Sequence, residues 1–180
     1  MSALLEVDGL DVDLAVPAGT LHAVRGMSFS VSKGETLCLV GESGCGKSMT
    51  ALALMGLLPR TATRRARRLE FAGIDLAKAG KKAVNGLRGA HMAMIFQEPM
   101  TALNPAYTIG NQLAEVYRRH KGATAAEARA RAIQLLGKVG IASAGDRLGH
   151  YPHQLSGGMR QRVMIAMALM CGPALIVADE

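Results

Sequence analysis

The eight residues from Gly41 to Ser48 read G-E-S-G-C-G-K-S, and this run constrains the fold more than any other part of the chain. It matches the pattern G-x-x-x-x-G-K-[ST], in which glycines allow backbone amides to turn toward phosphate oxygens. The apolar run Thr36–Val40 precedes it, and the helix-forming run Met49–Leu58 follows it before Pro59. A strand, a glycine-rich loop and a helix in this order predict a phosphate-binding loop in an α/β protein, with the positive end of the helix dipole beside the anion.

The same pattern predicts a role for the side chains of the loop. Lys47 is expected to bridge phosphate oxygens as a point charge, and the Ser48 hydroxyl to ligate Mg²⁺. The residues expected to contact the nucleotide are Gly41, Glu42, Ser43, Gly44, Cys45, Gly46, Lys47, Ser48 and Met49. Kinases, GTPases and transport ATPases all use such a loop, so this motif alone does not choose among them.

Composition limits the class of protein further. With 180 residues, 49% of them hydrophobic, the chain can form one domain with a subdomain. Its three cysteines (Cys38, Cys45 and Cys171) share no short metal-ligand spacing and are expected to be thiols in a reducing compartment. The net charge of +7 suits an anionic ligand or surface without naming one. The most apolar stretch, 163–178, is shorter than the roughly 20 residues of a membrane span and contains Gly172-Pro173, which favours a buried helix followed by a buried strand.

The first forty residues are expected to form β structure. Leu4–Val7, Met27–Val31 and Thr36–Val40 are short apolar runs, and Ser32–Glu35 is expected to turn into the third of them. Because Thr36–Val40 is apolar on both faces, it is predicted to be a covered strand of a parallel sheet. The arginine-rich run Arg60–Arg68 is interpreted as a solvated strand edge or loop, with contact to anionic lipid or nucleic acid as the alternative.

From Leu103 to Tyr151 the pattern becomes helical, after another expected strand at Met92–Phe96. Thr124 and Glu127 have the spacing of a capping box, in which each side chain binds a backbone amide at the start of a helix. These features predict a helical subdomain inserted into an α/β core.

Two further motifs lie near the end of the sequence. Leu155-Ser156-Gly157-Gly158 precedes the helical run Met159–Met170, so its amides would lie at a second helix N-terminus suited to an anion. The apolar run Leu175–Ala178 leads into Asp179 and Glu180. Carboxylates at a strand exit can hold Mg²⁺ through water and orient the water that attacks a phosphate.

In this order, the three motifs resemble those of the ABC ATPase family, although Met159 stands where the family's LSGGQ-type signature usually has Gln. The chain most closely resembles the ATP-binding subunits of oligopeptide and dipeptide importers. The matching segments are Leu4–Val7, Ala51–Gly56, Ile95–Pro105, Tyr151–Gln154 and the signature with its following helix.

The resemblance implies a P-loop NTPase (RecA-like) core with an N-terminal antiparallel β subdomain and an inserted α-helical subdomain. It divides the chain into 1–102 (β subdomain and first part of the core), 103–158 (helical subdomain ending in the signature) and 159–180 (return to the core through the Walker B strand). It also implies a truncation before the last core strands, so we expect the 180 residues alone to hydrolyse ATP weakly or not at all.

The resemblance also assigns roles within a site for ATP and Mg²⁺. Glu180 would be the catalytic base, assisted by Gln97 and Lys47, and Ser48, Gln97 and Asp179 would hold the metal. The signature residues would cap the γ-phosphate of ATP held by a second subunit; these are Leu155, Ser156, Gly157, Gly158 and Met159. Where the family usually stacks an aromatic ring on adenine, this chain offers Leu14 and His22.

The partners implied are a second ABC ATPase subunit, identical or different, integral membrane permease subunits and, indirectly, a substrate-binding protein. The expected location is the cytoplasmic face of the membrane, with no nucleic acid bound. The alternatives left open are a soluble ABC-type ATPase acting on nucleic acid or ribosomes, and an inactive truncated remnant. A nucleotide kinase is disfavoured by the Leu155–Gly158 motif.

Overall fold

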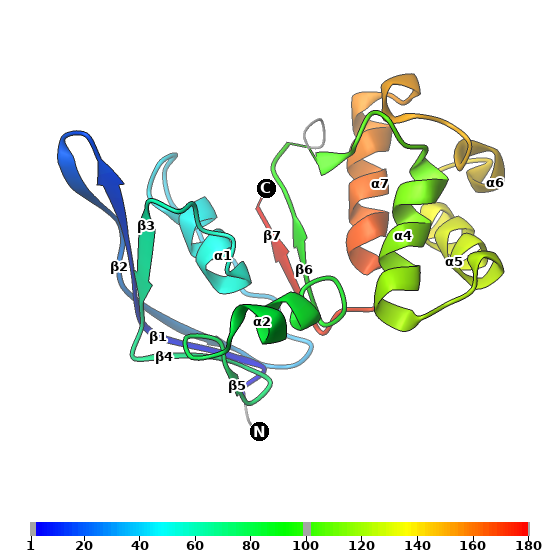
Figure 1. Ribbon diagram of the computed structural model, residues 1–180. Helices are drawn as coiled ribbons and strands as arrows, with labels where there is room; N and C mark the ends of the chain where they lie inside the picture. Colours follow the sequence, from blue (N-terminus) through cyan, green and yellow to red (C-terminus); the bar gives the residue numbers. More distant parts are fainter. Residues whose placement is uncertain (1–2, 99–101, 180) are drawn as a thin grey trace. The chain divides into compact units, whose positions relative to one another are not determined.

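A computed structural model describes residues 3–98 and 102–179. The chain divides into two compact units, Met1–Gly86 and Leu87–Glu180, which are described separately (Figure 1). The three-part division at residues 102 and 158 stays a prediction.

The first unit is an antiparallel sheet with a helix packed on one face. Its strands are β1 (Leu5–Val16), β2 (Gly19–Val31), β3 (Ala62–Arg65), β4 (Arg68–Phe71) and β5 (Ile74–Asp75). The order is β2-β1-β4-β5, and β3 also pairs with β1. Apolar side chains along β1 and β4 are buried beneath the helix; they include Leu5, Val7, Leu10, Val12 and Phe71. This confirms the predicted β structure at Leu4–Val7 and Met27–Val31, as well as the turn after β2, where the Glu35 amide bonds to Ser32 O.

The helix after the phosphate loop is α1 (Lys47–Met55), shorter at its end than the predicted Met49–Leu58. It ends because Gly56 adopts the left-handed conformation (φ 63°), and its N–H bonds back to Ala53 O. Glycine can adopt this conformation without a Cβ penalty, so it stops the helix before Pro59 is reached.

The predicted strand at Thr36–Val40 is wrong for the described structure. No ladder among the described residues includes these positions, and Val40 is 94% exposed. A strand requires a hydrogen-bonded neighbour, and apolar β-forming residues do not supply one by themselves.

The second unit begins near the end of α2 (Lys81–Leu87) and combines two parallel strands with a bundle of helices (Figure 1). The strands are β6 (Met92–Ile95) and β7 (Leu175–Ala178), paired in parallel. The helices are α4 (Ile109–Lys121), α5 (Ala125–Lys138), α6 (Ala144–Arg147), the 3₁₀ turn η1 (Pro152–Gln154) and α7 (Gly157–Leu169). The strand predicted at Met92–Phe96 and the helical region after Leu103 are therefore confirmed. The prediction of a fully buried strand at Leu175–Ala178 is only partly right, because Ile176 is 40% exposed.

The core of this unit lies between α4, α5 and α7. Leu113, Leu136, Val163 and Met170 are all at least 99% buried there. The predicted capping box starts α5: Thr124 Oγ1 accepts the Glu127 N–H, and the Thr124 N–H donates to Glu127 Oε2 at 2.8 Å.

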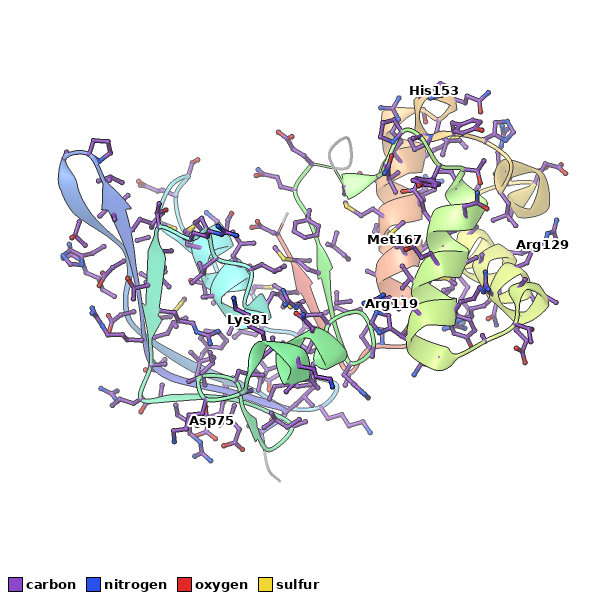
Figure 2. The ribbon with its side chains drawn as sticks, in the orientation of Figure 1. Asp75, Lys81, Arg119, Arg129, His153 and Met167 are labelled. Carbon is purple, nitrogen blue, oxygen red and sulfur yellow. The ribbon has the colours of Figure 1, made fainter. Side chains whose placement is uncertain are left out.

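The methionines of and beside the signature helix are used in packing. Met164 and Met170 are buried, and Met159 and Met167 (Met167 is labelled in Figure 2) pack against the cluster that contains Met170. Among the residues that the structure describes, none of the helices combines the length and apolarity needed to cross a bilayer. Within the same ranges, no three His, Cys, Asp or Glu side chains gather as a metal site.

Candidate nucleotide site

The phosphate loop lies at the N-terminus of α1, in the first unit. Lys47 is the first residue of the helix, and its Nζ donates to Gly41 O at 2.7 Å and to Glu42 O at 2.8 Å. The ammonium group is thus folded back over its own loop, where its acceptors are two backbone carbonyls of exposed residues and, at 3.8 Å, the Cys45 Sγ. A phosphate could replace these neutral acceptors with charged oxygens, which bind an ammonium group more strongly.

Two glycines of the loop are required by its geometry. Gly46 (φ 95°) caps α1, and a Cβ at this position would collide with the carbonyl oxygen of Ala23 in β2. Gly44 (φ 83°) also has a left-handed backbone that L side chains rarely adopt. Glycine therefore keeps the backbone at the helix N-terminus open to an anion, which fits the phosphate groups of a nucleotide. Ser48 lies in the first turn, next to Lys47, where a hydroxyl can serve as a metal ligand.

The signature motif forms a second helix N-terminus, in the second unit. Leu155 is buried in the helical core, and Ser156 caps α7 by accepting the Met159 N–H on its Oγ at 3.3 Å. Gly157 and Gly158 are exposed, and no atom lies within 4 Å of a Cβ built at either position. The first turn of α7 is therefore open to a ligand, as the motif predicts.

The strands β6 and β7 carry the remaining candidates at their carboxyl ends. The ladder pairs Ile95 with Ala178, and the Asp179 N–H donates to Ile95 O at 2.9 Å. Gln97 follows β6 by two residues and Asp179 follows β7 directly, so both leave the same edge of one parallel pair. Amide and carboxylate oxygens at such an edge are suitable Mg²⁺ ligands. Glu180, the expected catalytic base, lies outside the described residues, as do positions 99–101 of the predicted loop.

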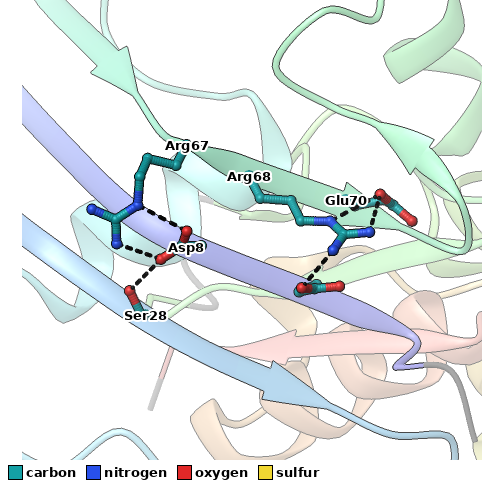
Figure 3. A network of polar contacts seen from close by, with 6 residues as sticks. Asp8, Ser28, Arg67, Arg68 and Glu70 are labelled. Carbon is teal, nitrogen blue, oxygen red and sulfur yellow. Dashed lines mark hydrogen bonds and ion pairs between the residues drawn. The ribbon is translucent and has the colours of Figure 1, made fainter.

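Three arginines of the arginine-rich run are held in ion pairs on the sheet surface (Figure 3). Arg67 binds Asp8, and Arg68 binds Glu6 and Glu70. Arg65 binds Asp13 in the same way. The hydrogen bond from Arg67 lowers the pKa of Asp8, so this carboxylate stays charged well into the acid range. The charge of these three arginines is thus neutralised on the strand surface, which favours the solvated-strand interpretation over contact with anionic lipid or nucleic acid.

Arg64 differs from these three arginines, and sequence reasoning missed its role. Its guanidinium reaches the α1 side of the sheet, donating to Ala53 O at 2.6 Å and to Leu76 O at 2.8 Å. Burial lowers its pKa from the usual value, with Asp75 acting in the opposite direction. Arg64 therefore fixes the C-terminal end of the helix whose N-terminus carries the phosphate loop. Successive side chains of a strand point to opposite faces of the sheet, and this alternation along β3 could have predicted that Arg64 and Arg65 face different sides.

The position of an adenine contact stays a prediction. Leu14 and Leu21 face each other across the β1–β2 ladder, and Leu21 is 55% exposed. His22 is exposed on the other side of the same hairpin and bonds to Asp13. No aromatic side chain belongs to this part of the hairpin.

These features (a glycine-capped helix with a lysine at its first position, a second open helix N-terminus and a parallel strand pair followed by Gln97 and Asp179) are those of the P-loop class of protein. A family comparison is more specific: residues 24–180 match the ABC transporter model. The chain belongs to the ABC transporter family.

Among curated relatives, the chain is 50% identical over its whole length to the dipeptide transport ATP-binding protein DppD of Bacillus subtilis. It is 51% identical over 99% of its length to DppD of Escherichia coli. It covers 54% of each of these relatives, so it spans about half their length. The glutathione import ATP-binding protein GsiA of Escherichia coli is 49% identical over 98% of the chain, which covers 29% of that relative.

Solved structures confirm the fold class. A dimeric bacterial ABC transporter cassette matches with a TM-score of 0.86 and 24% identity, over 98% of this chain and 73% of that one. An ATP-binding subunit of an ABC transporter matches with a TM-score of 0.73 and 29% identity, over 98% of this chain and 66% of that one.

Proposed function

We propose that the chain is the ATP-binding and ATP-hydrolysing part of an importer subunit that drives the uptake of dipeptides or oligopeptides. The observation that carries this proposal is the α1 N-terminus, where Gly46 leaves the backbone open and the Lys47 ammonium binds only uncharged groups of its own loop, Gly41 O, Glu42 O and Cys45 Sγ, among the described residues. The identity of about 50% to dipeptide transport proteins supports the peptide class of cargo.

In this proposal each residue has a defined task. Lys47 would leave Gly41 O and Glu42 O and neutralise phosphate charge, and Ser48 would ligate Mg²⁺. By the likeness to the family, Gln97 and Asp179 would supply further oxygen ligands for Mg²⁺. When bound, Mg²⁺ would neutralise charge on the phosphate oxygens. Glu180 would accept the proton of the attacking water, and Gln97 would orient that water.

The open N-terminus of α7 suggests a role between subunits. Ser156, Gly157 and Gly158 would bind the γ-phosphate of ATP held by a second ATPase subunit, because exposed amides at a helix N-terminus attract an anion. The dimeric cassette with the same fold supports such pairing. We further propose that permease subunits hold the dimer at the cytoplasmic face of a membrane and receive peptide from a substrate-binding protein.

The test is equilibrium binding of MgATP by isothermal titration calorimetry. Lys47→Ala is expected to weaken binding at least tenfold, because it removes the charge that meets the phosphates. Lys33→Ala is the matched control, since Lys33 is an exposed lysine in the turn after β2. Equal affinities for the Lys47→Ala and Lys33→Ala proteins would refute the proposed phosphate site.

A further inference from the structure

The face of the first-unit sheet that points away from α1 has an open hollow of about 400 Å³. Five ionisable side chains line it: Asp11, Asp13, His22, Arg25 and Arg65. Alternation along the strands explains this grouping. Val12 is buried and Arg64 reaches the α1 side, so their neighbours on β1 and β3 point the other way.

A bulge in β2 brings Arg25 to this hollow. The β1–β2 register passes from Val12↔Val24 to Leu10↔Met27, which leaves two residues of β2, Arg25 and Gly26, opposite Asp11. Gly26 has φ 56°, and its N–H donates to Asp11 Oδ1 at 2.8 Å. Bulges of this kind redirect side chains and are frequent beside binding sites.

Both oxygens of the Asp13 carboxylate accept hydrogen bonds from other side chains of the protein. Its Oδ1 bonds to His22 Nδ1 at 2.6 Å, and its Oδ2 accepts from Arg65 Nη2. The hydrogen bond from His22 is the largest cause of the lowered pKa of Asp13, and Arg65 adds to it. Asp13 thus holds His22 and Arg65 in place, and each of its oxygens already accepts one hydrogen bond.

Arg25 and Asp11 still have unused binding capacity. The Arg25 side chain makes no hydrogen bond or ion pair with any residue in the ranges 3–98 and 102–179. Asp11 accepts a hydrogen bond only at Oδ1, and Arg67 interacts with it through charge alone, without a hydrogen bond. No Arg25 nitrogen lies within the 4.0 Å ion-pair distance of Asp11. The hollow therefore presents a free cation and a free carboxylate oxygen that are separated from each other.

We propose that this hollow binds a zwitterion of the free amino acid or short peptide class. The ligand carboxylate would pair with the planar fork of Arg25, and the ligand ammonium with Asp11 Oδ2. Two arginines and two aspartates cancel in formal charge, so a neutral ligand with separated charges complements the hollow better than a simple anion or cation. Because the hollow is open to water, the dissociation constant is expected on the order of 1 mM.

This site is separate from the phosphate loop and is argued without the proposed function, although His22, one of the two candidate adenine contacts, lies at its edge. The loop approaches β2 at Ala23, whose carbonyl oxygen limits the residue at position 46 to glycine. The hollow lies on the opposite face of the same hairpin. A ligand that lacks phosphate can therefore be tested without interference from the ATP site.

The experiment compares three probes by isothermal titration calorimetry at pH 7 and constant ionic strength. Glycylglycine carries both charges, N-acetylglycine only the carboxylate, and glycinamide only the ammonium. Binding of glycylglycine at low millimolar concentration is expected, with N-acetylglycine and glycinamide at least fivefold weaker.

Two variants and one control locate the site. Arg25→Gln and Asp11→Asn are each expected to weaken glycylglycine binding at least fivefold. Asn can still accept the Gly26 N–H, so Asp11→Asn removes charge while preserving the bulge. Arg118→Gln, at an exposed arginine of α4, is expected to change nothing. Binding that survives both variants, or equal binding of glycylglycine and N-acetylglycine, would overturn the proposal, as would no binding at 20 times the expected dissociation constant of about 1 mM.

Discussion

Replacing Arg64 by methionine should destabilise the first unit far more than the same change at its neighbour Arg65. Arg64 is half-buried and donates two hydrogen bonds, to Ala53 O at the end of α1 and to Leu76 O beyond β5. Methionine retains an apolar stem of similar length and loses both donors. The two carbonyls would then have to find water or stay unpaired.

The magnitude follows from these contacts. A hydrogen bond from a charged donor contributes about 1.5–3 kcal/mol, so two would give about 3–6 kcal/mol in a dry interior. Water can reach part of this half-buried site, which reduces the expected loss to about 2–4 kcal/mol. Arg65 makes one ion pair and its side chain is 67% exposed. Surface pairs of this kind contribute about 0–1 kcal/mol, so Arg65→Met should be nearly neutral.

The assay is urea unfolding of the purified protein at pH 7, monitored by circular dichroism. The free energy of unfolding must fall with urea concentration at the same slope in all the compared proteins. The stability of Arg64→Lys should lie between those of the wild type and Arg64→Met, because an ammonium group preserves the charge without the planar fork. The free energies of unfolding of Arg64→Met and Arg65→Met could instead differ by less than about 0.5 kcal/mol, which is the usual spread for surface substitutions. Arg64 would then not anchor the end of α1.

Three more outcomes follow from local geometry. Thr124→Ala should destabilise the helical unit by about 1 kcal/mol in thermal unfolding, because it removes a helix cap; an unchanged melting temperature would contradict this. Hydrogen bonds from Thr124 lower the folded-state pKa of Glu127 below its unfolded value. Their contribution is therefore present above the unfolded pKa and lost as pH falls through the folded one. Alanine keeps the bond from the backbone N–H and removes only the bond from the hydroxyl, so the Thr124→Ala difference should shrink in acid by the hydroxyl's part. Gly46→Ala should abolish ATP binding, since the added methyl meets the Ala23 carbonyl and the backbone has φ 95°; retained affinity would show that the loop tolerates a Cβ. Alkylation of the exposed Cys45 should block ATP binding in the wild type and leave Cys45→Ser unaffected, and unchanged ATP affinity after complete alkylation would refute this.

Local signals in the sequence predicted local structure well. The capping box at Thr124 and Glu127 is present because it depends only on residues three positions apart. The phosphate loop and the signature also lie at helix N-termini, because each motif is a short run of consecutive residues. Pro59 predicts a later end for α1 than the structure shows, because the nearer Gly56 adopts the left-handed conformation and ends the helix first.

Features that depend on a neighbour in space were harder to predict. Thr36–Val40 has the composition of a buried strand, but pairing is decided by another segment, and none of the described ladders includes it. Likewise, five arginines between Arg60 and Arg68 look alike in the sequence. Only the sheet separates Arg64, which faces α1, from Arg65, which faces the hollow.

We propose above that this chain binds and hydrolyses ATP to drive a peptide importer. The most direct test is to purify the protein under native conditions from membranes of cells that make it, and to measure ATP hydrolysis and the co-purifying integral membrane proteins. We predict recovery with permease subunits and an ATPase activity that Lys47→Ala removes. Recovery without any permease subunit, or activity that persists in Lys47→Ala, would contradict the account.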